Sequence, residues 1–200
     1  MITYGIDLSS YNIVTDFGLI KKSGIRFAYI RMGGGGSFKD SLYDGYYQGL
    51  QSVGIKIGGY FYYNSESIVL QKNNLKNLAK VQFDLPIAID FELTCNNKAT
   101  DIENIILLLS LATELTGKKA VLYTSPGWLN GYLPYNPERL LGYKLWVANW
   151  TKIMPTIPYP FTEWLIWQYT NRLQIPGVKK PVDGNLYVGS LEELLTDVNS

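Results

Sequence analysis

The segment Leu85-Pro86-Ile87-Ala88-Ile89-Asp90-Phe91-Glu92 determines how this chain folds and where its chemistry lies. A near-continuous apolar run of this kind is typical of a strand that is buried on both faces of a parallel sheet. The run Phe27-Ala28-Tyr29-Ile30 has the same character. The two acids at the end of the first segment interrupt this apolar character, and charge in apolar sequence is costly unless it serves a purpose.

Eight short runs are apolar or aromatic and are bounded by turn residues, which is the pattern of strands. They are Thr3–Asp7, Arg26–Arg31, Lys56–Tyr63, Pro86–Glu92, Lys119–Thr124, Lys144–Asn149, Trp164–Tyr169 and Val182–Tyr187.

Helical patterns lie between several of these strands, at Thr15–Ser23, Ser41–Val53, Ser67–Val81, Thr100–Thr116 and Asn136–Leu141, with a last helix after Ser190. Capping boxes are expected for Thr100 with Glu103 and for Ser190 with Glu193, because a hydroxyl and a carboxylate three residues apart can satisfy free N–H groups reciprocally. Gly117 is expected to end the longest helix.

Strands that alternate with helices predict an α/β protein with a parallel sheet. Eight strands favour a single β/α barrel over residues 1–200, although 200 residues is short for such a barrel. The connections between the last three strands lack helical periodicity, so we expect about five β/α units and no late helices. An open doubly wound sheet is the alternative.

Composition excludes several classes of function. The chain has 18 Lys and Arg against 17 Asp and Glu, no histidine and one cysteine. Without histidine, Ser-His-Asp and Cys-His machinery and histidine metal sites are impossible. A net charge of +1 argues against a nucleic-acid partner. We expect no cofactor, no metal and no membrane insertion, and we see no signal peptide. Cys95 is expected to take no part in catalysis.

Four acids fall where the strands of a barrel meet its active-site edge. Asp7 ends the first strand, and Asp90 and Glu92 end the fourth. Asp183 lies at the start of the last strand or in a short strand that ends there. Side chains two apart on a strand share a face and are roughly 6 to 7 Å apart. In a desolvated pocket such a pair should raise one pKa. A carboxylic acid that keeps its proton can protonate the leaving oxygen of a glycosidic bond.

A series of motifs between about Tyr4 and Leu195 carries a family resemblance. In chain order they are Gly5-Ile6-Asp7-Leu8-Ser9-Ser10-Tyr11, Phe27-Ala28-Tyr29-Ile30-Arg31, Gly58-Gly59-Tyr60-Phe61-Tyr62-Tyr63, Pro86-Ile87-Ala88-Ile89-Asp90-Phe91-Glu92, Tyr123-Thr124-Ser125, Leu145-Trp146-Val147-Ala148-Asn149-Trp150, Trp167-Gln168-Tyr169, Val182-Asp183-Gly184-Asn185 and Gly189-Ser190-Leu191-Glu192-Glu193-Leu194. With them, the chain resembles the glycoside hydrolase family 25 lysozymes, which are N-acetylmuramidases of phage endolysins and bacterial autolysins. It departs from many members by lacking a histidine on the third strand.

The resemblance implies hydrolysis of the β-1,4 bond between N-acetylmuramic acid and N-acetylglucosamine in peptidoglycan, with retention of configuration. Glu92 would be the general acid and base. Asp90 would orient the substrate's acetamido group or serve as nucleophile, so an enzyme ester and N-acetyl assistance both stay open. Asp183 and Asp7 would complete the acidic cluster.

Residues at the ends of other strands are candidates for the sugar-binding wall: Tyr62, Gln168, Arg31, Trp150 and Tyr169. Arg31 could equally form a structural ion pair. Trp146 and Tyr60 could equally line the sugar-binding wall or belong to the core. The run Gly33–Gly36 lacks the spacing of a phosphate-binding loop and is expected to be a flexible loop at the cleft rim.

The expected partner is therefore the glycan of the bacterial cell wall, reached by a phage-encoded or exported enzyme without a separate wall-binding domain. The alternative function is a non-catalytic glycan-binding or structural barrel module, for example of a phage particle.

Overall fold

A computed structural model describes residues 1–93, 97–151 and 153–198, so Cys95 lies outside the described residues. The strands are β1 (Ile2–Leu8), β2 (Ile25–Gly34), β3 (Phe38–Lys39), β4 (Lys56–Tyr62), β5 (Ala88–Asp90), β6 (Val121–Thr124), β7 (Lys144–Ala148), β8 (Ile166–Leu173) and β9 (Val182–Val188). Eight of them close a barrel in the order β1-β9-β8-β7-β6-β5-β4-β2, because β1 also pairs with β2. The short β3 adds to the outer side of β2. The predicted barrel of about eight strands is confirmed.

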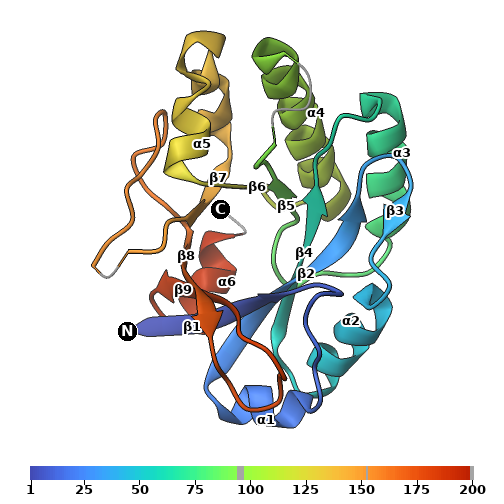
Figure 1. Cartoon of the computed structure of the whole chain (residues 1–200), viewed down its shortest axis with the longest axis vertical. Helices are drawn as coiled ribbons and strands as arrows, with labels where there is room; N and C mark the ends of the chain where they lie inside the picture. The colour runs from blue at the N-terminus through green and yellow to red at the C-terminus, as the bar shows by residue number, and fades with distance from the viewer. Residues whose placement is uncertain (94–96, 152, 199–200) are drawn as a thin grey trace.

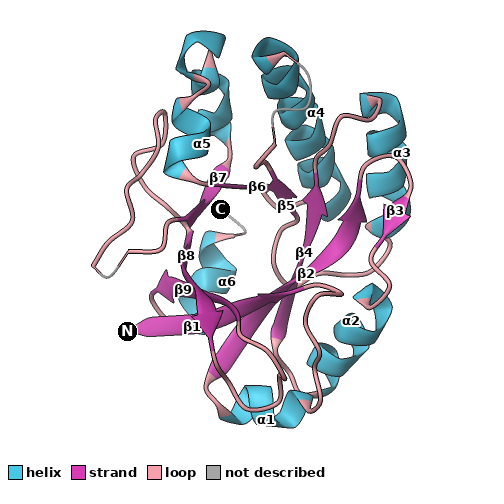
Figure 2. Ribbon diagram, viewed as in Figure 1, coloured by secondary structure: helices cyan, strands magenta, loops and turns pink. Residues whose placement is uncertain are grey.

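The helices are α1 (Phe17–Lys22), α2 (Tyr43–Ser52), α3 (Ile68–Leu78), α4 (Lys98–Thr116), α5 (Pro126–Asn130) and α6 (Leu191–Asp197), with 3₁₀ turns at Leu133–Tyr135 and Pro137–Gly142. Helices α1 to α5 follow one another around the outside of the strands (Figure 1). Loops rather than helices link β7 to β8 and β8 to β9 over the described residues (Figure 2). The structure therefore has the predicted five β/α units and irregular late connections.

Strand β9 runs antiparallel to both of its neighbours, β1 and β8. Its first residues therefore lie at the edge of the barrel where the parallel strands end. In the β1–β9 register Asp183 stands opposite Asp7. This reversal is what brings an acid at the start of a strand to the site formed by acids at the ends of other strands.

Several predicted boundaries need correction. The expected capping box of Thr100 and Glu103 is wrong, because α4 begins two residues earlier and the Asn97 side chain accepts a hydrogen bond from the Thr100 N–H at 2.9 Å. The helix expected at Asn136–Leu141 is a 3₁₀ helix at Pro137–Gly142. Gly33–Gly36 is only partly a loop, since Gly33 and Gly34 belong to β2. The capping box of Ser190 and Glu193 on α6 is confirmed.

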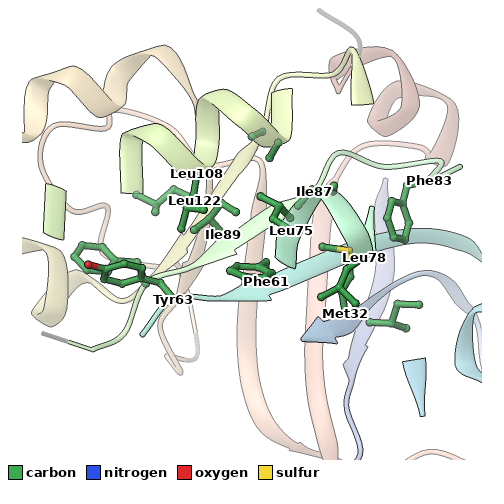
Figure 3. Packing of buried hydrophobic residues seen from close by; sticks show 14 of the residues in the cluster. Met32, Phe61, Tyr63, Leu75, Leu78, Phe83, Ile87, Ile89, Leu108 and Leu122 are labelled. Atoms are coloured by element: carbon green, nitrogen blue, oxygen red, sulfur yellow. The ribbon is translucent and has the colours of Figure 1, made fainter. Parts of the chain in front are cut away.

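Apolar side chains form one large cluster between the sheet and the surrounding helices. Figure 3 shows part of it, where Phe61 and Ile89 from the strands pack near Leu75 of α3 and Leu108 of α4. These four side chains are fully buried. Burial of a large aliphatic or aromatic side chain contributes about 1.5 to 3 kcal/mol, so this layer fixes the helices on the barrel.

A second cluster fills the barrel interior. The ring of Trp146 lies 4.6 Å from that of Tyr29, 6.4 Å from Tyr60 and 4.7 Å from Tyr123 between centroids, although the four residues come from four different strands. Leu194 of α6 belongs to the same cluster, so α6 closes the end of the barrel opposite the strand ends. The interior is therefore packed with aromatic rings.

Two glycines make room for these rings. A Cβ on Gly5 would lie 2.4 Å from the Phe27 ring, and a Cβ on Gly58 would lie 2.5 Å from the Tyr29 ring. A larger residue at either position would overpack a tightly filled interior, which typically costs about 1 to 3 kcal/mol. Within the described segments, no helix has the length and apolar character that crossing a membrane requires.

Candidate active site

Side chains from seven strands line one small pocket at the mouth of the barrel. The pocket has a volume of about 100 Å³ and contains all four predicted acids together with aromatic and amide side chains: Asp7, Tyr60, Asp90, Glu92, Tyr123, Trp146, Gln168 and Asp183. Glu92 lies two residues after the end of β5, and the other seven belong to β1 and β4 to β9. The four acids therefore lie together at the edge that the strand ends predict.

Asp7 is held by two buried amides. Its Oδ2 accepts hydrogen bonds from Gln168 Nε2 at 3.0 Å and from Asn185 Nδ2 at 2.8 Å. Asn185 is itself fixed, because its Oδ1 accepts a bond from Trp146 Nε1 at 2.8 Å. The Asp7 side chain is only 8% exposed, so these donors define its orientation.

The side chains of Asp90, at the end of β5, and of Glu92, two residues further on, line the same pocket. Asp90 is 6% exposed, and its buried Oδ1 has no hydrogen-bond partner among the described atoms. Glu92 is exposed to solvent at the pocket mouth. The intervening Phe91 is fixed from both sides, since its N–H donates to the Tyr123 carbonyl at 2.9 Å and its carbonyl accepts from Thr124 Oγ1 at 2.9 Å. This anchoring determines where both carboxyls point.

Burial raises the pKa of every one of the four acids. The charge of Asp183 further raises the pKa of Asp7, and the charges of Glu92 and Asp7 further raise the pKa of Asp90. The pKa of Glu92 is raised by burial, lowered by a hydrogen bond from Asp90, and raised again by Asp183. Like charges in a desolvated pocket cannot all ionise, so the cluster holds protons that isolated carboxyls would lose.

Two tyrosines line the pocket: Tyr60, which was an open candidate, and Tyr123, which is not among the predicted site residues. Burial, together with the charges of the acids, raises the pKa of Tyr60 and of Tyr123 well above the ordinary value. Both therefore stay neutral and act as hydrogen-bonding groups. Tyr123 donates to Gln168 Oε1 at 3.1 Å. Tyr60 and Trp146, for which the sequence left core and site equally open, belong to both.

Asn185 is a further site residue that the sequence analysis missed. Asp183 and Asn185 are two apart on β9, so strand alternation places them on one face. The sequence therefore carries the same signal for this pair as for Asp90 and Glu92.

The predicted sugar-binding residues lie in three different places. Gln168 lines the acid pocket, and Trp150 Nε1 donates to its Oε1 at 3.1 Å, although the Trp150 side chain is 58% exposed. Tyr62 lines an adjoining groove. Tyr169 lines neither cavity; its ring lies 6.5 Å from Tyr4 and 6.2 Å from Trp167.

Arg31 lines the same adjoining groove but is already paired. Its Nε lies 2.7 Å from Asp40 Oδ2, and its Nη2 donates to Ser10 Oγ at 2.9 Å. The structural ion pair considered for Arg31 is therefore present.

The groove itself has a volume of about 530 Å³ and begins at the acids. It is lined by Ser9, Tyr11, Arg31, Gly34, Phe38, Tyr60, Tyr62, Asn64, Asp90, Glu92 and Asp183. Ligand sites commonly span about 300 to 1,000 Å³. Among the described residues, no group of three or more His, Cys, Asp or Glu side chains is arranged to hold a metal ion. An acid cluster beside an open groove supplies the groups that carboxylate-catalysed hydrolysis needs.

Comparison with known proteins gives the family. The protein-family model described as "Glycosyl hydrolases family 25" matches residues 6–178 of this chain. Lysozyme M1 of Streptomyces globisporus is 27% identical over 212 residues, and the match covers 98% of this chain and 71% of the length of that lysozyme. The autolytic lysozyme of Clostridium acetobutylicum is 25% identical, covering 90% of this chain and 54% of its own. The crystal structure of the bacterial lysozyme from Streptomyces coelicolor has a TM-score of 0.88 at 25% identity, covering 98% of this chain and 97% of its own.

The chain belongs to glycosyl hydrolase family 25. It is a glycoside hydrolase of the lysozyme type, and its broad activity is that of a peptidoglycan hydrolase.

Proposed function

We propose that this enzyme cleaves the β-1,4 bond between N-acetylmuramic acid and N-acetylglucosamine in the bacterial cell wall, with retention of anomeric configuration. The observation that supports this proposal is the convergence of Asp90 and Glu92 with Asp7 and Asp183 in one pocket at the end of an open groove. We also propose that residues 1–200 act as one catalytic domain.

Glu92 acts as general acid and base in this proposal. It lies at the pocket mouth, where a glycosidic oxygen can approach, and burial raises its pKa. Asp90 and Glu92 share a hydrogen bond and titrate as a pair. In the first step Glu92 transfers a proton to the leaving oxygen while the bond from that oxygen to C1 breaks. In the second step its carboxylate takes a proton from the water that attacks C1.

Asp90 faces the developing positive charge at C1. Its carboxylate either attacks C1 to form an ester or orients the acetamido group, whose carbonyl oxygen then attacks. Either nucleophile approaches opposite the leaving oxygen, and water replaces it from the first side, so both routes retain configuration. Whichever of Asp7 and Asp183 is ionised adds negative charge that stabilises this cation and keeps the proton on the catalytic pair.

The sugar-binding residues surround this centre. Gln168 is 2% exposed and its amide is bonded to Asp7, Tyr123 and Trp150, so its part is to hold the acid and the Trp150 ring in position for the substrate. Trp150 offers an exposed ring face beside it, and Tyr62 lines the groove. Tyr169 packs on Tyr4 outside the pocket, so we assign it a structural role rather than contact with the sugar.

The alternative of a non-catalytic glycan-binding module is not favoured, because the complete acid set lies together in the pocket. Replacement of Glu92 tests the proposal. Glu92→Gln should abolish release of reducing ends from purified Gram-positive walls while thermal unfolding remains cooperative. Glu114→Gln, which changes an exposed acid of α4, is the matched control and should retain full activity. Full activity of Glu92→Gln would refute the assignment.

A further inference from the structure

The groove wall carries an aromatic surface that the catalytic scheme does not use. The Arg31 guanidinium lies 4.9 Å from the ring centroid of Tyr11 and 5.5 Å from that of Phe38. Both aromatic side chains line the groove together with the catalytic acids. Tyr11 is 78% exposed and Phe38 is 48% exposed, so both offer ring surface to a ligand.

The Arg31 side chain that contacts both rings is itself held in place. It is 15% exposed, and its partner Asp40 is 1% exposed. Asp40 also accepts hydrogen bonds from the backbone N–H groups of Ser10 at 3.0 Å and Leu42 at 2.9 Å. A cation at this distance attracts the face of an aromatic ring. Arg31 therefore holds the two rings in place, and Asp40 neutralises its charge.

The glycine run explains how Phe38 reaches this position. Gly33 and Gly34 pair with Lys39 and Phe38 across the β2–β3 hairpin. A Cβ on Gly33 would lie 2.0 Å from the Phe38 carbonyl oxygen. Gly35 has φ +55°, a left-handed conformation that favours glycine. The tight hairpin therefore requires glycine.

Asn74 of α3 secures the hairpin from behind. Its Nδ2 lies 3.0 Å from the Gly34 carbonyl, 3.1 Å from the Gly35 carbonyl and 3.1 Å from the Phe38 carbonyl. Phe38 is thus positioned by backbone interactions that do not depend on its ring.

We propose that Tyr11 and Phe38 form a stacking subsite for a sugar ring of the glycan strand, outside the pair of sugars that flank the cleaved bond. A pyranose presents an apolar C–H face that fits a flat ring, and exposed rings held in advance cost little entropy on binding. The acid pocket of about 100 Å³ accommodates the reacting centre, and the groove of about 530 Å³ extends beyond it. Because Arg31 is paired with Asp40, it acts as a positioning residue for the two rings. This inference rests on the proposed glycosidase function.

The test compares KM and kcat for Tyr11→Ala and Phe38→Ala on long purified glycan strands and on the shortest oligosaccharide that the enzyme cleaves. On long strands each variant should raise KM about two- to tenfold, since a ring contact of this kind contributes about 0.5 to 1.5 kcal/mol. The value of kcat should change less than about twofold, and KM for the short substrate should not change. Phe38→Tyr should keep the parent KM.

Tyr47→Ala is the matched control. Tyr47 lies on α2, its hydroxyl donates to the Gln82 carbonyl at 2.8 Å, and it lines a cavity near the start of β4, at the opposite end of the barrel. It should leave KM unchanged. An unchanged KM for both groove variants, or an equal rise for Tyr47→Ala, would overturn the subsite.

A measurement of glycan binding distinguishes failure of the subsite from failure of the proposed catalytic function. In a Glu92→Gln background, calorimetry with the same glycan strands should give a Kd that Tyr11→Ala and Phe38→Ala each raise about two- to tenfold. If the wild type releases no reducing ends but the rings still control Kd, the catalytic proposal fails and the subsite stands. If the wild type is active and Kd is insensitive to both rings, the subsite fails alone.

Discussion

Replacing Asp90 with Asn should make the protein more stable and less active. The carboxyl is 6% exposed, its Oδ1 has no hydrogen-bond partner among the described atoms, and Glu92 and Asp7 lie close enough to raise its pKa. Burial and these charges disfavour the ionised form in the folded state. The site therefore carries a stability cost that an amide, which is neutral and can donate to Glu92, removes.

The magnitude follows from the environment. Asparagine also leaves a polar atom at the Oδ1 position without a partner, so what it removes is the cost of holding an acid beside Glu92 and Asp7, about 1 to 3 kcal/mol for a buried charged group. For a chain of this length each kcal/mol changes Tm by about 2 to 4 °C. Asp90→Asn should therefore raise Tm by about 2 to 12 °C at pH 7. Loss of the carboxyl from the reacting centre should lower kcat at least about a hundredfold.

The sign of the pH dependence provides a sharper check. The folded-state pKa of Asp90 is raised above the ordinary Asp value of about 3.9, so its cost appears as pH rises above that value. Below about pH 3.5 both folded and unfolded chains carry the proton, and the advantage of Asn should disappear. Calorimetric unfolding from pH 3 to pH 8 measures this difference directly.

An exposed aspartate gives the control. Asp44 on α2 has a side chain that is 63% exposed, and its ion pair with Lys39 lies on the surface. Asp44→Asn should change Tm by no more than about 4 °C and should not raise it, because exposed pairs contribute about 0 to 1 kcal/mol. A lower Tm for Asp90→Asn at pH 7, or a gain that persists unchanged at pH 3, would refute the reasoning.

Three further predictions concern acidity, the pocket frame and the hairpin. Because burial raises the Glu92 pKa above its ordinary value of 4.5, kcat/KM should stay high above pH 4.5 and fall at a higher pH; a fall complete by pH 4.5 would contradict this. Asn185→Leu removes a donor from Asp7 and the acceptor of a buried indole N–H, so urea unfolding should show a loss of about 2 to 4 kcal/mol. Gly33→Ala should cost about 1 to 3 kcal/mol and weaken binding of long glycan strands, since its Cβ would meet the Phe38 carbonyl oxygen; unchanged stability and KM would contradict this.

The sequence predicted those parts of the site that strand ends determine. Asp7 and Asp90 end parallel strands, so their convergence follows from barrel geometry. Asp183 reaches the same edge for a reason that periodicity alone cannot supply, namely that β9 runs in the opposite direction. The family resemblance, rather than periodicity, supports its place in the cluster.

Other residues could not be placed because their roles depend on tertiary contacts. The partly buried ring of Tyr60 packs against Trp146 and also lines the pocket, and no local pattern in the sequence predicts that one side chain does both. The hairpin that places Phe38 over Arg31 depends on hydrogen bonds from Asn74, about forty residues away along the chain. A glycine-rich run alone indicates a flexible loop.

Tyr169 does not lie where the sequence analysis expected it. Gln168 and Tyr169 are neighbours on β8, and neighbouring strand residues point to opposite faces. With Gln168 bonded to Asp7 inside the barrel, Tyr169 must face outward, where its ring packs against Tyr4 and Trp167. Strand alternation alone therefore excludes one of these two residues from the pocket.

Mass spectrometry of soluble fragments from purified Gram-positive walls would decide which bond is cut and whether Glu92 is essential. Wild-type enzyme should release fragments that end in reducing N-acetylmuramic acid, and Glu92→Gln should release none. Fragments that end in reducing N-acetylglucosamine would overturn the bond assignment, and undiminished release by Glu92→Gln would overturn the catalytic role of Glu92.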